Sequence, residues 1–491
     1  MRAVRLLHCV FALLFAVAGV RAGDAEFRGV WVASVHNLDW PSRAGLSAAE
    51  QKAQLRAMLD RAVSLKLNAI LLQVRPACDA LYASKKEPWS QFLTGTQGVS
   101  PGYDPLAFAV AEAHARGLEL HAWFNPFRAA VDSGAKLAAN HVAREHPDWT
   151  RHFGSQLWLD PGEPAARDHV LGVILDVVRR YDIDGVHIDD YFYPYPLKRG
   201  DASFPDEATW ACHGAASGLS REDWRRDNIN RFVQAMYRGV KGAKSGVRVG
   251  ISPFGIWRPG YPAQIKGFDA YQELYADSRN WIKNGWCDYL SPQLYWQIGQ
   301  APQSYPVLLK WWLDQNPKKR HIWPGNYTGR VGDGSKTSWP REEVIQQIGA
   351  TRNLSASGAT GNVHYSMKCL MNNRGGISDT LSSGVYSQPA LVPPSPWLRD
   401  HAPGKPKIAI DSDDPSGHLR LSWKPAGKES PWLWVVQAQI GGAWTTRILP
   451  AATQSLRLDA KNSDSQATAF AISEVDRYGM RSAVSTVNSR E

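Results

Sequence analysis

Apolar and polar positions alternate with two different periods along residues 27–385. Short apolar runs of strand length are followed by longer stretches in which apolar residues recur every three to four positions, as on one face of a helix. This order of strand and helix predicts a parallel sheet with helical crossovers. The expected strands lie at residues 27–35, 68–75, 118–125, 185–190, 247–253, 288–295, 321–327 and 362–367.

Helical stretches fall between these runs. Ser47 followed by Glu50 forms a capping-box start for the first of them. Eight strand–helix pairs over roughly 350 residues predict an α/β protein whose strands close into a (β/α)₈ barrel of the TIM type with enlarged loops. The clearest expected helices lie at residues 47–65, 104–116, 165–181, 223–243 and 341–355.

The pattern changes after residue 388. Residues 389–406 are rich in proline and are expected to form a stiff linker. Residues 407–491 show short apolar runs separated by turns, without a helical period, which predicts a small all-β sandwich. A chain of 491 residues is also too long for one core, so we expect a barrel domain at 27–388 and a sandwich at 407–491.

The N-terminal segment has the three parts of a secretory signal peptide. Arg2 and Arg5 precede an apolar run at residues 9–20, and Val20-Arg21-Ala22 follows as the expected cleavage site, with cleavage after Ala22. We therefore expect residues 1–22 to be a signal peptide and the mature protein to be secreted, into a periplasm. No later stretch approaches the ~18 apolar residues that a membrane helix needs, so no membrane span is expected after cleavage.

The chain is basic, with 56 Lys and Arg against 46 Asp and Glu, a formal net charge of +10. It has neither a Lys/Arg block nor a zinc-finger spacing, so we expect no nucleic-acid partner and favour an anionic polymer of the cell envelope. Four cysteines follow the expected signal peptide without a C-x-x-C pair, and their pairing is left open: Cys78, Cys212, Cys287 and Cys369.

The fourth expected strand ends in two adjacent carboxylates, Asp189 and Asp190, followed by aromatic residues. Side chains alternate along a strand, so Val186 and Ile188 share one face while His187 and Asp189 share the other. In a barrel, the second face points inward, and carboxylates at the carboxyl end of a strand are typical of catalytic sites. The alternative is a surface turn whose aspartates cap the next helix.

Hydrogen-bonding and aromatic residues recur at the other expected strand ends and in the loops beside them. Individually, each could make an ordinary hydrogen bond inside a barrel, but together they predict a pocket for a hydroxyl-rich ligand. The candidate substrate-binding residues are Gln73, Arg75, Trp89, Trp123, Asn125, Arg128, Asp160, His187, Tyr191, Ser252, Trp257, Gln293, Tyr295 and Trp296.

Cleavage of a glycosidic bond usually needs two carboxyl groups, one protonated and one ionised. Asp189 is the first choice for the ionised group. Glu87 is a candidate acid, because packing against Trp89 would raise its pKa, although a solvated Glu87 paired with a neighbouring lysine explains the sequence equally well. Asp160 is a further candidate, and the alternative for it is an N-cap.

Separated motifs lie at residues 27–32, 73–76, 87–90, 102–106, 123–126, 184–194 and 291–296, with a further one at 474–479 in the C-terminal region. Together they resemble the bacterial glycosyl hydrolase-like 10 family. Such a resemblance implies a TIM-type barrel, often followed by a fibronectin type III-like module to which 474–479 are similar, and cleavage of peptidoglycan strands that have lost their stem peptides. It also implies Glu87, Asp189 and Asp190 as catalytic residues.

The sequence thus predicts an exported glycoside hydrolase that acts on a polysaccharide of the cell envelope. A hydrolase of another polysaccharide and a barrel that binds glycan without cutting it remain alternatives. No metal or cofactor is expected, because the first strand ends at His36 without the paired histidines of metal-dependent barrels. The stereochemical outcome, the acid and nucleophile roles and any protein partner stay open.

Overall fold

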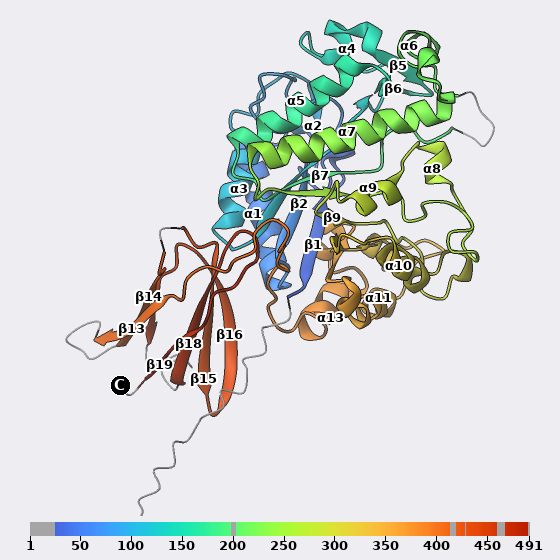
Figure 1. Ribbon diagram of the computed structural model, residues 1–491. Coiled ribbons are helices and arrows are strands. Elements are labelled where there is room, and N and C mark those ends of the chain that lie inside the picture. The colour runs from blue at the N-terminus through green and yellow to red at the C-terminus, as the bar shows by residue number, and fades with distance from the viewer. Residues whose placement is uncertain (1–24, 198–202, 413–418, 428, 459–466, 490–491) are drawn as a thin grey trace, which may run out of the picture.

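The computed structural model describes residues 25–197, 203–412, 419–427, 429–458 and 467–489 (Figure 1). The expected signal peptide at 1–22 lies outside these residues. A nine-stranded sheet forms the larger part of the molecule, in the order β10-β9-β8-β7-β3-β2-β1-β12-β11. Its strands are β1 (Phe27–Val32), β2 (Ala69–Arg75), β3 (Glu119–Phe124), β7 (Gly185–Ile188), β8 (Arg248–Ile251), β9 (Tyr289–Leu290), β10 (His321–Ile322), β11 (Gly325–Asn326) and β12 (Gly361–His364).

Every pairing in this sheet is parallel, and both of its outer strands come from residues 321–326. β10 pairs with β9, while β11, two residues further on, pairs with β12. Each expected strand is found, the seventh as two short pieces. The α/β class and the parallel sheet predicted from the sequence are therefore confirmed.

Helices cover the outside of this sheet. α1 begins with the expected capping box, in which Ser47 and Glu50 bind each other's backbone N–H. Figure 1 shows α5 and α7 lying side by side across the strands, and these two helices pack together. The helices are α1 (Ala48–Ser64), α2 (Gln91–Thr94), α3 (Pro105–His114), α4 (Val142–Glu145), α5 (Pro164–Arg180), α6 (Glu207–His213), α7 (Arg221–Ala243), α8 (Ala270–Glu273), α9 (Ser278–Asn284), α10 (Tyr305–Asp314), α11 (Arg341–Asn353), α12 (Met367–Met371) and α13 (Ile377–Ser383).

The alternation of side chains along β7 follows the prediction. Val186 and Ile188 belong to the large core between strands and helices, whereas His187 points to the opposite side. That side holds a second, smaller cluster that includes Tyr289, and close packing there requires glycine. A Cβ at Gly250 would lie 1.9 Å from Cζ of Tyr289. The members of the second cluster are Phe27, Trp31, Ala33, Ala69, Leu71, Trp123, Tyr289, Trp323, Val363 and Val392.

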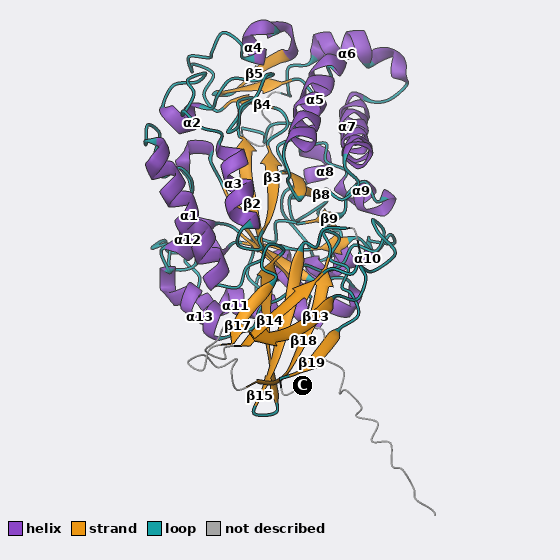
Figure 2. Ribbon diagram, turned by 90° about the vertical axis from the view of Figure 1, so that its left-hand side faces the viewer, coloured by secondary structure: helices purple, strands orange, loops and turns teal. Residues whose placement is uncertain are grey.

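The connection between β3 and α5 is enlarged into a small antiparallel sheet, in the order β4-β6-β5. Figure 2 shows this region, with α4 and α6, beyond the carboxyl ends of β2 and β3. Long loops at this end are what place side chains around a site. The three strands are β4 (Arg128–Ala130), β5 (Thr150–Phe153) and β6 (Gln156–Leu159).

The C-terminal region is all-β, as expected. It holds a three-stranded sheet in the order β13-β14-β17 and a four-stranded sheet in the order β16-β15-β18-β19, with a buried core that includes Trp423 and Trp434. Figure 2 shows it at the end of the molecule opposite β4 and β5. The strands are β13 (Lys407–Ser412), β14 (Leu419–Lys424), β15 (Leu433–Ile440), β16 (Ala443–Pro450), β17 (Ser455–Leu458), β18 (Ala467–Val475) and β19 (Ser485–Asn488).

The β-region contacts the amino-terminal end of the parallel sheet. Arg477 forms ion pairs with Asp182 and Asp184, which immediately precede β7. The proline-rich segment between the two regions is also packed: Val392 joins the inner cluster, and Ser395 accepts a hydrogen bond from Nε of Arg248. This segment is therefore part of the contact between the two regions, and it lies away from the carboxyl ends of the strands.

Cys78, Cys212, Cys287 and Cys369 are all free thiols in the structure. Within the described ranges, no helix combines the length and the apolar character that crossing a membrane would require.

Candidate active site

A cavity of about 200 Å³ opens where the parallel strands end. Its polar groups come from the segments after β7, β8 and β9, while β1 and β3 and the segments after β11 and β12 supply aromatic rings. The residues predicted from the sequence that line it are Trp123, Asp189, Asp190, Tyr191, Ser252, Gln293 and Tyr295. The lining also includes Trp31, Tyr195, Tyr327 and Tyr365.

Asp189 is buried, with 4% of its surface exposed, and its carboxylate accepts hydrogen bonds from two N–H groups presented by β3 and the residues after it. Trp123 donates through Nε1 to Oδ2 at 3.0 Å, and Asn125 donates through Nδ2 at 3.3 Å. The backbone N–H of Arg128 binds Oδ1 of Asn125, which fixes the amide so that its NH₂ faces Asp189. Asp189 is therefore surrounded by groups that can only donate.

Asp190, the second residue after β7, has a different environment. It is 3% exposed, and its carboxylate accepts hydrogen bonds from the Tyr195 hydroxyl and from Gln293. A hydroxyl can accept as well as donate, so Tyr195 can also bind a protonated Asp190. The two aspartates thus share one pocket but differ in the hydrogen bonds that hold them.

Burial raises the pKa of both carboxyl groups. For Asp189, burial and repulsion by Asp190 raise the pKa to about 7, against the opposing charge of Arg128. For Asp190, burial raises the pKa, while the hydrogen bonds from Tyr195 and Gln293 oppose the rise. Neighbouring carboxyls in one dry site titrate as a pair, so this pair keeps one proton until the pH approaches neutrality.

Arg128 does not line the cavity, but its positive charge acts on Asp189. Its guanidinium lies 5.0 Å from the centre of the Tyr191 ring, and it donates to the carbonyl oxygen of Pro76 at 2.9 Å. These contacts fix a positive charge beside the carboxyl pair. Arg128 was predicted to bind substrate, and its position is compatible with an anionic group on the ligand.

His187 lies inside the sheet beneath the cavity and does not line it. Its Nε2 accepts a hydrogen bond from Nε1 of Trp31 at 3.1 Å, and its Nδ1 contacts the Tyr289 hydroxyl at 3.0 Å. Burial keeps the pKa of His187 well below its usual value, so the ring is neutral. The structure therefore gives His187 a positioning role: it orients Trp31, which lines the cavity.

Aromatic rings form the remaining wall. The rings of Tyr295 and Tyr327 lie 4.8 Å apart, and Tyr365 lies 5.8 Å from Tyr295 and 6.1 Å from Trp31. Ring faces beside carboxylates and hydroxyl groups make a surface that suits sugars, which have apolar C–H faces and polar edges.

Glu87 does not fit the role of general acid expected from the sequence. It is buried away from the cavity, where Oε2 accepts from Nε of Arg75 at 2.8 Å and Oε1 contacts Nε2 of His169 at 3.1 Å. Burial alone would raise the pKa of Glu87, but Arg75 and His169 outweigh it and lower the pKa to about 2. A carboxyl that stays ionised in this way cannot donate a proton near neutral pH, so the expected raised pKa is wrong.

The expectation that Arg75 binds substrate is also wrong, because its side chain does not line the cavity. Its side chain is fully buried, and besides Glu87 it donates to the carbonyl oxygens of Asn125 and Pro126 at 2.6 and 2.9 Å. The Arg75–Glu87 pair therefore holds the turn after β3 that carries Asn125. The ion pair stabilises the backbone next to the cavity, and neither of its residues lines the cavity.

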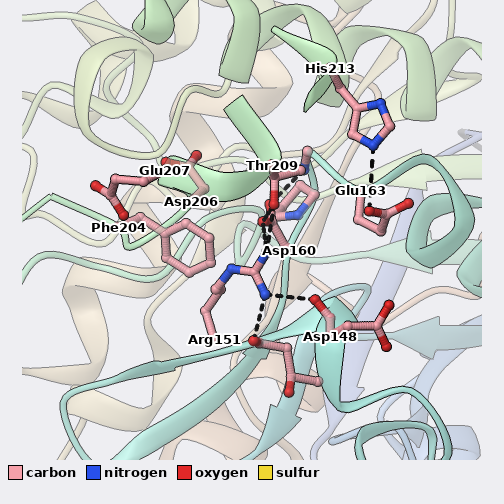
Figure 3. Close-up of polar contacts among 12 residues, drawn as sticks. Asp148, Arg151, Asp160, Glu163, Phe204, Asp206, Glu207, Thr209 and His213 are labelled. Carbon is pink, nitrogen blue, oxygen red and sulfur yellow. Dashed lines mark hydrogen bonds and ion pairs between the residues drawn. The ribbon is translucent and has the colours of Figure 1, made fainter. Parts of the chain in front are cut away.

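Asp160 is also placed outside the cavity, in the enlarged loop region (Figure 3). Its carboxylate accepts from the Thr209 hydroxyl at 2.6 Å and from the backbone N–H of Gly162 at 2.8 Å, and it pairs with Arg151 at 3.1 Å. These bonds tie β5 and the turn after β6 to α6. Asp160 is therefore a structural residue of this region, and the N-cap of α5 is Glu163.

Four other predicted binding residues contact protein instead of the cavity. Gln73 accepts hydrogen bonds from the backbone N–H groups of Ser34 and Val35 at 3.0 and 2.9 Å. Trp257 is buried among the rings of Tyr261, Tyr271 and Trp311. Trp89 packs on the large core. Trp296 packs against Phe254.

Three of the four residues that the sequence analysis missed carry a signal that it could have used. Trp31 lies near the end of β1, and Tyr327 and Tyr365 directly follow β11 and β12, where the same inward alternation applies. Tyr195 carries no such signal, because it lies in an irregular loop five positions after Asp190.

Comparison with known proteins agrees with the motifs. The family model for glycosyl hydrolase-like 10 matches residues 26–340. The chain belongs to this family. The resemblance seen in the sequence is thereby confirmed, and with it the assignment of the chain to a family of glycoside hydrolases.

Two curated relatives of this glycosyl hydrolase-like 10 protein are named glycosyl hydrolases. YngK of Bacillus subtilis (strain 168) is 44% identical over 405 residues, which cover 81% of this chain and 79% of that protein. DigH of Escherichia coli (strain K12) is 37% identical over 341 residues, which cover 65% of this chain and 77% of that protein.

Solved structures with a similar course of the chain include two glycosidase domains. One is the catalytic domain of a beta-amylase from Paenibacillus polymyxa, with a TM-score of 0.49, 13% identity and coverage of 74% of this chain and 99% of that chain. The other is the glycoside hydrolase domain of PgaB (BpsB) from Bordetella bronchiseptica, with a TM-score of 0.47, 15% identity and coverage of 73% and 98%.

Proposed function

We propose that this protein is an exported, periplasmic glycoside hydrolase that cleaves glycan strands of the cell envelope, with peptidoglycan strands lacking stem peptides as its substrate. The observation that carries the proposal is the buried pair Asp189–Asp190 in an aromatic pocket at the carboxyl ends of the parallel strands. The position of the pocket in the sheet and the chemistry of its lining both suit hydrolysis of a sugar polymer.

The carboxyl pair supplies the acid–base chemistry. Because the pair keeps one proton below neutral pH, one aspartate is able to protonate the leaving glycosidic oxygen while the other stays ionised. This replaces the pairing of Asp189 with Glu87 expected from the sequence. The fixed donors Trp123 and Asn125 keep Asp189 in position throughout.

The fold assignment that accompanies this function is a closed (β/α)₈ barrel of the TIM type at 27–388, a connecting segment at 389–406 and a fibronectin type III-like sandwich at 407–491. The meeting of both sheet edges in residues 321–326 supports a closed barrel. The two antiparallel sheets and their shared core support a sandwich. Residues 1–22 act as the signal peptide in this proposal.

An extended substrate is supported by a second groove that meets the cavity. Tyr195 lines both the cavity and a neighbouring space of about 640 Å³ that includes Phe268 and Gln272. The rings of Tyr195 and Phe268 stack at 5.2 Å and form a platform beside the carboxyl pair. A polymer can therefore lie across the site, with one sugar in the cavity and the next over this platform.

The anionic character of peptide-free strands supports their choice as substrate. Loss of the stem peptide leaves a lactyl carboxylate on alternate sugars, and Arg128 offers a fixed positive charge next to Tyr191, which lines the cavity. The basic net charge of the chain also favours attraction to an anionic polymer.

Mass spectrometry of the released products tests the proposal. The purified mature protein is incubated with intact sacculi and with sacculi whose peptides an amidase has removed. Fragments that are multiples of the disaccharide, released from the stripped material alone, are the expected result, and Asp190→Asn abolishes them. Binding to the glycan without any release would instead favour a non-catalytic module, and release from unrelated polysaccharides alone would reject the substrate.

A further inference from the structure

The two carboxyl groups of the pocket come from consecutive residues at the end of one strand. In the usual two-carboxylate mechanisms the groups approach the sugar from opposite sides, some 5–9 Å apart, and one of them attacks the anomeric carbon or activates water there. Among the described residues that line the cavity, Asp189 and Asp190 are the carboxyl groups, and both come directly after β7. The opposite wall consists of tyrosine and tryptophan rings.

Three other buried carboxyls near the strand ends are committed elsewhere. Glu87 is bound to Arg75 and His169, and Asp160 to Thr209 and Arg151. Asp39, the acidic residue close to Tyr365, is saturated as well. Its Oδ1 accepts from the Ser366 hydroxyl and the Lys368 backbone N–H at 2.8 and 2.7 Å, and its Oδ2 accepts from the Ala33 backbone N–H at 2.8 Å. None of these groups is placed to attack from the far wall.

The hydrogen-bond partners of Asp189 and Asp190 differ, and they favour ionisation of one carboxyl group and protonation of the other. Asp189 accepts hydrogen bonds from Trp123 and Asn125, whose N–H groups can only donate, and these bonds stabilise its ionised form. The carboxylate can also accept one more N–H from a ligand. Asp190 is held by the Tyr195 hydroxyl, which can accept the proton of a neutral carboxyl. The proton shared by the pair is therefore best placed on Asp190, and the negative charge on Asp189.

We propose that the nucleophile is the substrate's own 2-acetamido oxygen, and that the enzyme is specific for 2-acetamido sugars in the cavity. This inference rests on the proposed glycosidase function and specifies its chemistry. Asp189 accepts a hydrogen bond from the acetamido N–H and stabilises the positive charge that develops there. Trp31 and Tyr365 both line the cavity, with ring centroids 6.1 Å apart in an edge-to-face arrangement, and they provide an apolar surface for the acetamido methyl group.

The atoms balance over two steps. In the first, the acetamido carbonyl oxygen forms a bond to C1, the bond from C1 to the glycosidic oxygen breaks, and its electron pair takes the proton of Asp190. In the second, water forms a bond to C1, the bond from C1 to the acetamido oxygen breaks, and the water proton returns to Asp190. C1 is inverted twice, so hydrolysis proceeds with net retention of configuration.

The test changes the nucleophilicity of the acetamido oxygen in the polymer. Peptide-free glycan strands are N-deacetylated and then re-acylated with either acetyl or trifluoroacetyl groups, and the release of fragments by the full-length mature enzyme is followed. Strands with restored acetyl groups are expected to be cleaved at the rate of untreated strands. Trifluoroacetylated strands are expected to be cleaved at least 100-fold more slowly, because fluorine withdraws electrons from the attacking oxygen.

Equal cleavage of acetylated and trifluoroacetylated strands, or inversion at C1 by NMR of the first product, would overturn the inference and leave the glycosidase function standing. Failure to cleave even untreated strands would overturn both. The Asp189→Asn variant adds a check that does not depend on the altered polymer: a cyclic thiazoline analogue of N-acetylglucosamine should bind the wild type at least 10-fold more tightly than this variant. Unchanged affinity would contradict the contact between Asp189 and the acetamido nitrogen.

Discussion

Nε1 of Trp123 lies 3.0 Å from Oδ2 of Asp189 and reaches it from the neighbouring strand. The bond joins β3 to the end of β7 and fixes the carboxylate at the floor of the cavity. Because the indole can only donate, it favours the ionised form of Asp189.

Trp123→Phe should keep an aromatic ring in this wall but remove the donor. A hydrogen bond to a charged group contributes about 1.5–3 kcal/mol, so we expect kcat/KM to fall roughly 10- to 100-fold. Steady-state rates on peptide-free strands measure this change. Trp257→Phe, the same substitution in a buried cluster away from the cavity, is the control, and an equal loss in both variants would show that the hydrogen bond is unimportant.

The carboxyl pair predicts how activity depends on pH. Burial and mutual repulsion raise the pKa of Asp189 to about 7, so the pair loses its last proton as the pH rises through that region. Activity requires this proton, and we expect kcat/KM to be highest on the acidic side and to fall above about pH 7. A rate that increases steadily from pH 6 to pH 9 would contradict protonation of the pair.

The same raised pKa should make the pair destabilising at high pH. The folded pair holds one proton that the unfolded chain releases near pH 4, so the stability that the protonated pair contributes is present at low pH and lost as the pH rises through about 7. Asp189→Asn removes that loss. We expect the variant to be inactive but more stable than the wild type by roughly 2–4 kcal/mol at pH 8, with little difference at pH 4.

Denaturant unfolding at the two pH values measures this effect. Asp168→Asn, on the exposed face of α5, changes the same chemical group where it is solvated, and it should shift neither activity nor stability. If Asp189→Asn is less stable than the wild type at pH 8, then ionisation of the buried carboxyl pair does not destabilise the folded state as predicted.

Glu87 gives the opposite pH dependence. Its pKa is lowered to about 2, so its contribution to stability is present above the unfolded value of 4.5 and is lost as the pH falls toward 2. Glu87→Gln leaves Arg75 buried without its counter-ion, and removing one partner of such a pair costs about 3–5 kcal/mol. We expect a loss of this size in denaturant unfolding at pH 7, with Glu145→Gln on the surface as a neutral control.

A catalytic Glu87 would behave differently in the same experiment. If it were the general acid, the variant would remain stable and lose activity on all glycans. If the ion pair is structural, as the geometry indicates, the variant that remains folded at low temperature should keep substantial activity.

The periodic part of the molecule could be predicted from the sequence, because strand alternation and helical spacing are local properties. The expected strands are found, and the side chain of His187 on β7 points to the inner side of the sheet, as predicted. The alternation also carries the information for Trp31 near the end of β1 and for Tyr327 and Tyr365 directly after β11 and β12.

The partners of buried charges could not be predicted in this way. Glu87 and Trp89 are neighbours in the sequence, but the pKa of Glu87 is decided by Arg75 on β2 and His169 on α5. Spatial contacts between distant segments leave no periodic signal in a single sequence. Tyr195, in an irregular loop, illustrates the same limit for a residue that binds the catalytic pair.

Arg128 provides a prediction about the substrate. Its guanidinium stacks near Tyr191 and lies beside the carboxyl pair, where it opposes the rise in the pKa of Asp189. If it binds the lactyl carboxylate of peptide-free strands, Arg128→Gln should weaken binding to these strands about 10-fold, as expected for loss of a charge-assisted hydrogen bond. Binding of neutral chitin oligomers should change less than 2-fold, and Arg179→Gln on the surface should change neither.

Equilibrium binding measured in an inactive Asp190→Asn background separates recognition from cleavage. Increasing salt should reduce the difference between the two ligands in the parent background, because screening weakens the contact of Arg128 with an anion more than the stacking of sugars on rings. Equal weakening on both ligands would mean that Arg128 acts by holding Tyr191 and the carbonyl of Pro76 in place, and the substrate's charge would then have to be recognised elsewhere.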